Sequence, residues 1–213
     1  MVDALILGGG LAGSAAACLI ARGGKSVNLL ERAASPHHKV CGEFLSVEAT
    51  RHLRQLGIDP VTLGAVPINR IRVVRGSHEV EAKLPFTAFG LSRFTLDEAL
   101  IEKAEAYGAH IERGVRVLEL NGHVARTTQG ERKGSQVLLA TGKLPIRVEG
   151  QMLSNPAIDG FVGFKMHYRL AAAATEALAG TIILNLFKGG YLGLQLVESG
   201  RANLCLIVRR KAL

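Results

Sequence analysis

The sequence predicts an α/β fold: a Rossmann-like domain and part of an antiparallel β-sheet domain. Two observations predict it. Between residues 4 and 31, an apolar run, a glycine-rich turn, an alanine-rich segment and a second apolar run follow one another, as in a strand–helix–strand unit. After residue 160, several runs alternate apolar and polar residues, with glycines between them, as strands joined by turns do.

The composition limits the class of protein. Hydrophobic residues make up 48% of the 213 residues and charged residues 21%, which excludes a disordered chain. The three cysteines are odd in number and far apart, which favours a cytoplasmic protein over a secreted disulfide scaffold. Residues 4–21 carry no charge, but three consecutive glycines interrupt them, so we expect no membrane-spanning segment.

The formal net charge of +8 raises the question of nucleic-acid binding. Lys and Arg are scattered and form no run interleaved with aromatic residues, so we expect no nucleic-acid partner. The charge instead indicates a generally basic surface, or a preference for phosphorylated and acidic small molecules.

The first part of the chain carries the signals of alternating strands and helices. The two apolar runs are short enough for buried strands, and Gly23 and Gly24 are suited to end the helix between them. In chain order we expect a strand at 4–7, a helix at 11–21, a strand at 26–30, a polar loop at 33–43 and a helix at 46–56.

The middle of the chain contains two hairpin signals and a helix signal. Residues 68–84 alternate around Gly76 and Ser77, and Asn121 and Gly122 lie between two further runs, at 115–120 and 123–128. The segment T-L-D-E at residues 95–98 has the form of a capping box, which predicts a helix from there to Tyr107. A buried strand is expected at residues 136–140.

The run at residues 161–170 alternates cleanly. Its apolar face consists of Val162, Phe164, Met166, Tyr168 and Leu170. The other face carries Lys165, His167 and Arg169, and we expect it to face solvent. The alternative is a pocket wall that receives an anionic or carbonyl group.

Further strands are expected at 181–187, 191–197 and 202–208, in an antiparallel sheet with no amphipathic helix left to cover it. These patterns divide the chain into a strand-and-helix part at residues 1–66 and 90–148 and a sheet part at 67–89 and 149–213.

A G-x-G-x-x-G motif at residues 8–13 follows the first strand and opens the first helix. Gly8 permits a tight turn, Gly10 lets the backbone approach a pyrophosphate, and Gly13 allows the helix to pack closely on the strand. The helix N-terminus then offers N–H groups to the phosphates. Glu31, at the end of the second strand, is placed to accept hydrogen bonds from ribose hydroxyls. The motif alone leaves a plain glycine-rich turn open and does not separate FAD from NAD.

Several segments together resemble a known family. They are Glu31 and Arg32, K-V-C-G-E-F-L-S at 39–46, L-S-R-F-T-L-D-E-A-L at 91–100, A-T-G-K at 140–143 and G-F-K-M at 163–166. These segments resemble the geranylgeranyl reductase branch of the FAD-dependent monooxygenase superfamily, which has the p-hydroxybenzoate hydroxylase-like fold. The resemblance covers essentially the whole chain in order.

The resemblance implies FAD as the cofactor, with an FAD-binding domain at residues 1–66 and 90–148 and a partial substrate domain at 67–89 and 149–213. It also assigns residues to the cofactor. The implied cofactor-binding residues are Gly8, Gly10, Leu11, Ala12, Gly13, Glu31, Arg32, Cys41, Gly42, Arg93, Val117, Thr141 and Gly142. Among them, Arg93 can reach phosphate or ribityl oxygens with its guanidinium group. For Val117, Thr141 and Gly142, ordinary strand packing is almost as good an interpretation.

Cys41 is the candidate catalytic residue. It lies in a polar loop two residues after Lys39, and a nearby cation favours a reactive thiolate. The resemblance places this cysteine near the flavin ring and the substrate; an inert loop cysteine is the alternative. Cys18 and Cys205 lie on apolar runs and are expected in the core. His37, His38 and Cys41 have no fourth ligand at a recognisable spacing, so no metal site is expected.

The resemblance further implies a flavin that is reduced by NAD(P)H. Because the sequence has no second glycine motif, the NAD(P)H is expected to bind transiently. The reaction would be double-bond reduction or hydroxylation of a hydrophobic, isoprenoid- or polyketide-like substrate. The alternative is a non-catalytic FAD- or ADP-binding fragment. An ordinary NAD-dependent dehydrogenase is disfavoured, because alternating strands follow at residues 68–84 instead of further strand–helix units.

The resembling family also continues well beyond the point that matches Leu213. We therefore expect the chain to be incomplete as an enzyme. An open sheet edge would permit self-association, and peripheral contact with a membrane is compatible with a hydrophobic substrate.

Overall fold

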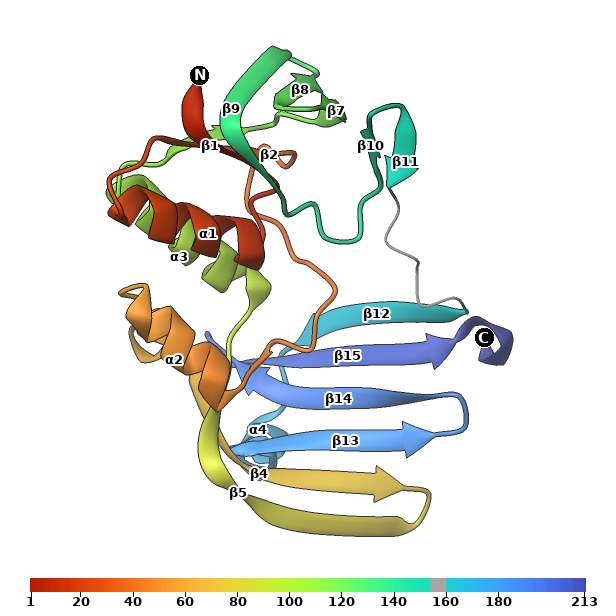
Figure 1. The fold of residues 1–213 in the computed structure, drawn as a ribbon. Coiled ribbons are helices and arrows are strands. Elements are labelled where there is room, and N and C mark those ends of the chain that lie inside the picture. Colours follow the sequence, from red (N-terminus) through yellow and green to blue (C-terminus); the bar gives the residue numbers. More distant parts are fainter. Residues whose placement is uncertain (154–159) are drawn as a thin grey trace. The chain divides into compact units, whose positions relative to one another are not determined.

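The computed structural model describes residues 1–153 and 160–213, and the chain divides into two compact units, each with its own sheet (Figure 1). The first unit comprises Met1–His37 and Leu96–Ala157, and the second His38–Thr95 and Ile158–Leu213. The predicted domains divide the chain by function, into cofactor-binding and substrate-binding residues, whereas these units divide it by packing. The predicted domains therefore stay a prediction.

The first unit has an eight-stranded sheet in the order β11-β10-β7-β8-β9-β1-β2-β6. Its strands are β1 (Val2–Leu7), β2 (Val27–Glu31), β6 (His110–Arg113), β7 (Val117–Asn121), β8 (Val124–Thr127), β9 (Gly130–Leu139), β10 (Ile146–Val148) and β11 (Gln151–Leu153). Strands β9, β1, β2 and β6 are parallel, whereas β7, β8 and β9 form an antiparallel meander. This sheet confirms the Rossmann-like fold.

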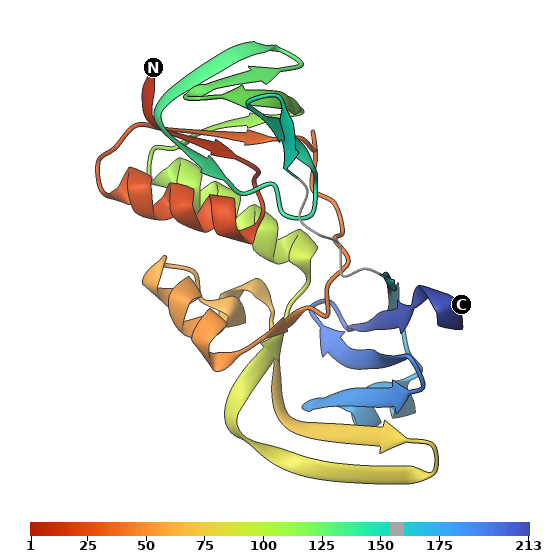
Figure 2. The same ribbon diagram turned by 45° about the vertical axis from the view of Figure 1, so that its right-hand side comes forward.

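Helices α1 (Leu11–Arg22) and α3 (Arg93–Ala106) run side by side along this sheet (Figures 1 and 2). The thiol of Cys18 in α1 donates to the carbonyl oxygen of Leu100 in α3 at 3.4 Å. Elsewhere in this unit, Leu5 and Leu7 of β1 and Leu30 of β2 are buried in one apolar cluster. Burial of such side chains stabilises the parallel strands that carry the glycine turn.

The second unit has a seven-stranded sheet in the order β12-β15-β14-β13-β4-β5-β3. Its strands are β3 (Phe44–Leu45), β4 (Val66–Arg75), β5 (His78–Gly90), β12 (Phe161–Tyr168), β13 (Thr181–Phe187), β14 (Gly190–Val197) and β15 (Arg201–Arg209). Its helices are α2 (Val47–Gln55), η1 (Pro60–Leu63), α4 (Ala172–Leu178) and η2 (Arg210–Ala212). The long hairpin of β4 and β5 is plain in Figure 2. The predicted antiparallel order holds for β12, β15, β14 and β13, but β13 pairs with β4 in parallel.

Three predictions about elements were wrong. The helix predicted from Thr95 begins at Arg93, because the hydroxyl of Ser92, rather than that of Thr95, accepts the first free N–H group, from Thr95 at 3.2 Å. The strand predicted as buried at residues 136–140 is the end of β9 and is partly exposed, with Leu139 at 45%. Helix α4 was not predicted; its Leu178 packs against Leu196 and Ala202 of the sheet.

Among the described residues, none of the helices combines the length and the apolar character that crossing a membrane requires.

Candidate functional site

The glycine turn of the first unit can be built only from glycine at two positions. Gly8 has a φ of +115°, and a Cβ atom there would clash with the carbonyl oxygen of Ala140. A Cβ atom at Gly13 would clash with the carbonyl oxygen of Gly8. The turn therefore packs α1 directly against the ends of β1 and β9, with no side chain between them.

The carboxylate of Glu31 lies against this turn. Its Oε2 accepts the N–H of Gly9 at 2.8 Å, and its Oε1 accepts the N–H of Ala33 at 2.8 Å. Each carboxylate oxygen has a second lone pair, so Glu31 can still accept hydrogen bonds from ribose hydroxyls. The structure thus places Glu31 beside the glycine turn, and its contact with a ribose stays a prediction.

The N-terminus of α1 carries no capping side chain. Its N-cap residue is Gly10, and the first turn contains no acidic residue. The first N–H groups of the helix and its partial positive charge are therefore available to an anion. Together with the glycine turn and Glu31, this arrangement fits the pyrophosphate and ribose of a dinucleotide such as FAD.

The other predicted residues of the first unit are less closely gathered. The Cα of Thr141 would lie 3.2 Å from a Cβ placed at Gly8, so the turn after β9 adjoins the glycine turn. Gly142 has a φ of +65° in the same turn. Arg32 is exposed, and Val117 is half-buried at the start of β7. Their predicted contacts with a cofactor stay predictions.

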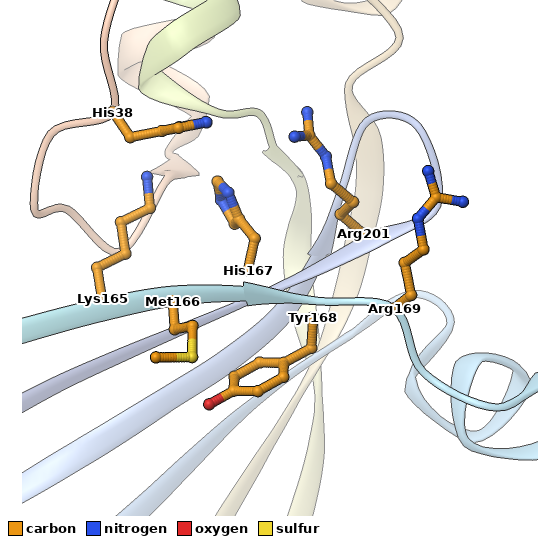
Figure 3. Close-up of a pocket in the computed structure, with 7 residues that line it drawn as sticks. All are labelled: His38, Lys165, Met166, His167, Tyr168, Arg169 and Arg201. Carbon is orange, nitrogen blue, oxygen red and sulfur yellow. The ribbon is translucent and has the colours of Figure 1, made fainter.

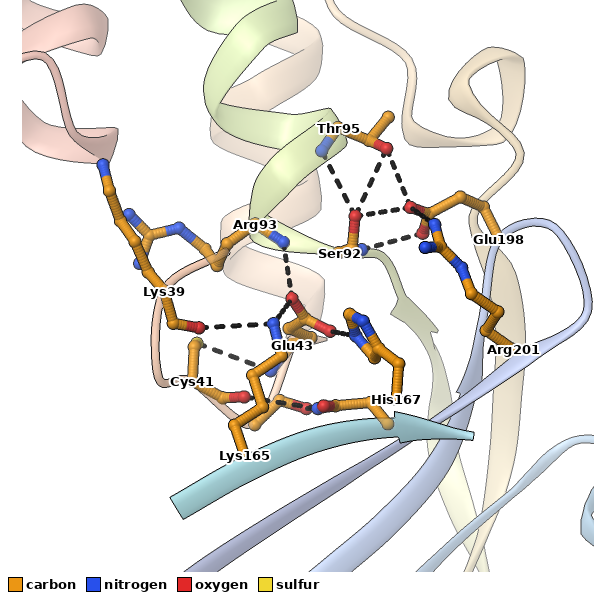
Figure 4. Close-up of polar contacts among 12 residues, drawn as sticks. Lys39, Cys41, Glu43, Ser92, Arg93, Thr95, Lys165, His167, Glu198 and Arg201 are labelled. Carbon is orange, nitrogen blue, oxygen red and sulfur yellow. Dashed lines mark hydrogen bonds and ion pairs between the residues drawn. The ribbon is translucent and has the colours of Figure 1, made fainter. Parts of the chain in front are cut away.

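In the second unit, Cys41, Gly42 and Arg93 are brought together around a residue that was not predicted, Glu43. Glu43 is 2% exposed and has a φ of +58°. Its Oε1 accepts the N–H of Arg93 at 2.7 Å and the ammonium group of Lys165, and its Oε2 pairs with Nε2 of His167 at 2.7 Å (Figure 4).

Side chains of the sheet also hold the backbone of the loop at residues 39–43. Lys165 donates to the carbonyl oxygen of Lys39 at 3.2 Å, and Gln195 to that of Glu43 at 2.7 Å. Asn203 donates to the carbonyl oxygens of Cys41 at 3.2 Å and Gly42 at 2.9 Å. Lys165, Gln195 and Asn203 of the sheet therefore hold the loop backbone, and the Glu43 side chain holds the loop from the other direction. The half-buried thiol of Cys41 is positioned with the loop.

A second buried carboxylate holds the start of α3. Glu198 accepts the N–H of Ser92 at 2.8 Å, the hydroxyl of Thr95 at 2.8 Å and the hydroxyl of Ser92, and it pairs with Arg201 at 3.5 Å. Burial disfavours the charged form, but the hydrogen bonds from Ser92 and Thr95 outweigh it, so the pKa of Glu198 lies below its usual range.

The prediction that the polar face of β12 is a solvent face was wrong for two of its three residues. The side chains of Lys165 and His167 are 5% and 12% exposed, because both lie beneath the loop at residues 39–43 and pair with Glu43. Arg169, just past the strand, is exposed as predicted. On the apolar face, Met166 is 55% exposed.

His38, Glu43 and His167 could offer ligand atoms to a metal ion, since these atoms lie within 4.8 Å of one another. The ammonium group of Lys165 already occupies one oxygen of Glu43, however, and opposes a second cation. The surroundings also lower the pKa of His38, first through burial and then through the electrostatic influence of Lys165 and His167. This charge distribution suits an anion better than a metal.

The strand–turn–helix and the acidic residue at the end of β2 define a dinucleotide-binding domain. Comparison with known proteins specifies the family. Residues 1–139 match the family model described as FAD binding domain, and the chain belongs to this family.

Curated relatives carry several enzyme names. The chain is 32% identical over 124 residues to a menaquinone reductase of Mycobacterium tuberculosis, a match over 56% of this chain and 30% of that protein. It is 32% identical over 127 residues to a squalene monooxygenase of Candida glabrata (53% and 26%), and 30% identical over 125 residues to a flavin-dependent halogenase of Armillaria mellea (55% and 24%). The aligned region is therefore less than a third of each relative.

Solved structures show the same fold over nearly the whole chain. The myxobacterial chondrochloren halogenase CndH matches with a TM-score of 0.79 and 21% identity, over 99% of this chain and 53% of that one. A flavoprotein/dehydrogenase from Cytophaga hutchinsonii matches with a TM-score of 0.79 and 19% identity, over 99% and 56%. The chain spans about half the length of these structures, and both matches confirm the fold.

Proposed function

We propose that this chain is the FAD-binding portion of a flavin-dependent oxidoreductase. The observation that carries the proposal is the contact of the Glu31 carboxylate with the Gly9 N–H, beside an uncapped helix N-terminus. FAD supplies the hydride and oxygen chemistry when it is bound, and the protein supplies binding and orientation.

The residues of the first unit divide this task. The N–H groups at the start of α1 bind the pyrophosphate, Gly10 lets it approach the backbone, and Gly8 and Gly13 allow the tight turn and its packing. Glu31 accepts the ribose hydroxyls, and a charge-assisted hydrogen bond of this kind is stronger than a neutral one. Arg32, Val117, Thr141 and Gly142 complete the proposed contacts with the ADP half.

For the reaction, we propose reduction or hydroxylation of a hydrophobic substrate, with NAD(P)H as the electron donor. The names of the relatives include both a reductase and a monooxygenase, and menaquinone and squalene are both isoprenoid lipids. The motif at residues 39–46 supports the geranylgeranyl reductase branch. Arg93, Cys41 and Gly42 are assigned to the cofactor by the same resemblance. A non-catalytic FAD-binding fragment is the second candidate, because the matched family model describes FAD binding and no reaction.

Competition binding tests the proposal. Purified chain is titrated with FAD, and ADP, FMN and NAD⁺ are then offered as competitors. We expect FAD to bind and ADP to displace it, because the residues of the glycine turn recognise the ADP half, whereas FMN lacks that half and does not compete. Displacement by FMN but not by ADP would refute the proposed site. NAD⁺ binding more tightly than FAD would refute the choice of cofactor.

A further inference from the structure

A pocket of about 500 Å³ lies on the second unit, and most of its lining is basic (Figure 3). Its lining residues are His38, Lys165, Met166, His167, Tyr168, Arg169 and Arg201. The side chains of His38, Lys165, His167, Arg169 and Arg201 lie on one side of β12, and those of Met166 and Tyr168 lie on the other.

The positive charges in this pocket are only partly compensated. Lys165 and His167 pair with Glu43, and Arg201 pairs with Glu198 at the long distance of 3.5 Å. Arg169 is exposed and has no ion pair with any residue of the described ranges 1–153 and 160–213. The two carboxylates therefore leave at least one full positive charge at the pocket.

Arg201 has an unfilled donor as well. Its Nε is buried and finds no hydrogen-bond acceptor in the described part of the chain. The Arg201 side chain is nevertheless 29% exposed and lines the pocket, so the rest of its guanidinium group is open to a ligand. A guanidinium group offers several donors in a fixed plane, which suits the oxygens of a phosphate or a carboxylate. A phosphate dianion also compensates more charge than a carboxylate does.

We propose that this pocket binds the phosphate group of a small molecule, through Arg169 and Arg201, with the ring of His38 at its wall. The site differs from the glycine turn of the first unit, and the proposal does not rest on FAD binding. The buried Lys165 and His167 remain paired with Glu43.

Titration with inorganic phosphate, followed through the imidazole protons of His38 by NMR, tests this inference. Chloride keeps the ionic strength constant, and a His38→Gln variant assigns the resonance. We expect a saturable shift of the His38 signal, and weaker saturation with acetate. Bound phosphate is also expected to raise the pKa of His38, because it compensates the neighbouring positive charges. The glycine turn is also proposed to bind phosphate, but His38 is not part of it. The His38 signal therefore reports on the pocket and not on the turn.

The matched variants are Arg169→Gln and Arg75→Gln, which each remove one exposed arginine from the second unit. We expect Arg169→Gln to weaken phosphate binding about tenfold and Arg75→Gln less than twofold. Equal weakening by both variants, or a His38 signal that does not respond to phosphate, would overturn the proposal. Competition with NADPH and NADH identifies the molecule that carries the phosphate. Stronger displacement of phosphate by NADPH than by NADH points to a nucleotide phosphate. If neither displaces phosphate, the ligand is another phosphorylated molecule.

Discussion

The Glu43 carboxylate accepts the backbone N–H of Arg93 at 2.7 Å, so a buried acid from a distant loop holds the first turn of α3. Glu198 does the same for the neighbouring N–H of Ser92, at 2.8 Å. Both carboxylates lie at the positive end of the helix dipole, where a negative charge is favoured. The start of α3, the loop at residues 39–43 and strand β12 are thereby joined through buried polar contacts.

Replacement of Glu43 by Gln is expected to lower the free energy of unfolding by about 3–5 kcal/mol, because it leaves the buried ammonium group of Lys165 without its counter-charge. Urea denaturation monitored by circular dichroism measures this. Glu79→Gln is the control: Glu79 pairs with Arg72 at 3.2 Å, but its side chain is 55% exposed, so we expect a loss below about 1 kcal/mol.

A double variant separates charge from packing at the same place. Glu43→Gln with Lys165→Met removes both charges, and we expect it to recover part of the lost stability. If the double variant is no more stable than Glu43→Gln, the ion pair is not the reason for the loss.

The stability of the second unit should depend on the protonation of Glu198. Its pKa is lower in the folded state than its usual value of 4.5, so its contribution is complete above that value and is lost as the pH falls through the folded pKa. Glu198→Gln should therefore be less stable than the wild type at pH 7, and the difference should shrink in acid. Unfolding curves between pH 7 and pH 3 measure it; a difference that does not change with pH would contradict this role.

Replacement of Gly13 by Ala should destabilise the first unit by about 1–3 kcal/mol and weaken FAD binding, because the added Cβ clashes with the Gly8 carbonyl oxygen. Gly193→Ala is the control, since a Cβ there meets its nearest neighbours at 3.8 Å, an ordinary contact. Thermal unfolding and FAD titration of both variants check this. Wild-type behaviour of Gly13→Ala would show that the turn is wider than the structure has it.

Much of the fold follows from local sequence. The β1–turn–α1–β2 unit and both hairpins were predicted, because glycine positions and the apolar period are local signals. The start of α3 was misplaced because Thr95, which looks like a cap, donates its hydroxyl to Glu198 instead. Strand β9 was misjudged because an apolar run indicates burial without showing what packs against it.

Where a motif links residues in the sequence, as with Glu31 and the glycine turn, the structure places them in contact, and their role toward a cofactor stays a prediction. Glu43 belongs to the motif at residues 39–46, but the sequence does not predict its role. Its partners Lys165 and His167 lie 122 and 124 residues away in the sequence. The same separation explains why the sequence predicts a solvent face for the polar side of β12, whereas Lys165 and His167 are covered. Alternation shows which residues share a face, but not what covers it.

Cys41 should react with an alkylating reagent faster than Cys18. Cys41 is half-buried in the loop, whereas Cys18 is fully buried, and burial raises the pKa of the Cys18 thiol. If Cys41 contacts the cofactor as proposed, bound FAD should slow its labelling. Peptide mapping with and without FAD measures both rates. Equal labelling of Cys41 in the two samples would remove it from the proposed cofactor site.

The FAD affinity of Glu31→Gln tests the central claim most directly. The substitution keeps the shape of the side chain and removes the charge, and Glu102→Gln, an exposed position on α3, removes the same charge elsewhere in the first unit. Circular dichroism confirms that both variants are folded, and FAD fluorescence quenching gives the dissociation constants. We expect Glu31→Gln to bind FAD about tenfold more weakly, a loss on the order of 1.5 kcal/mol, and Glu102→Gln to bind like the wild type. Unchanged affinity in folded Glu31→Gln would contradict the proposed placement of the ribose.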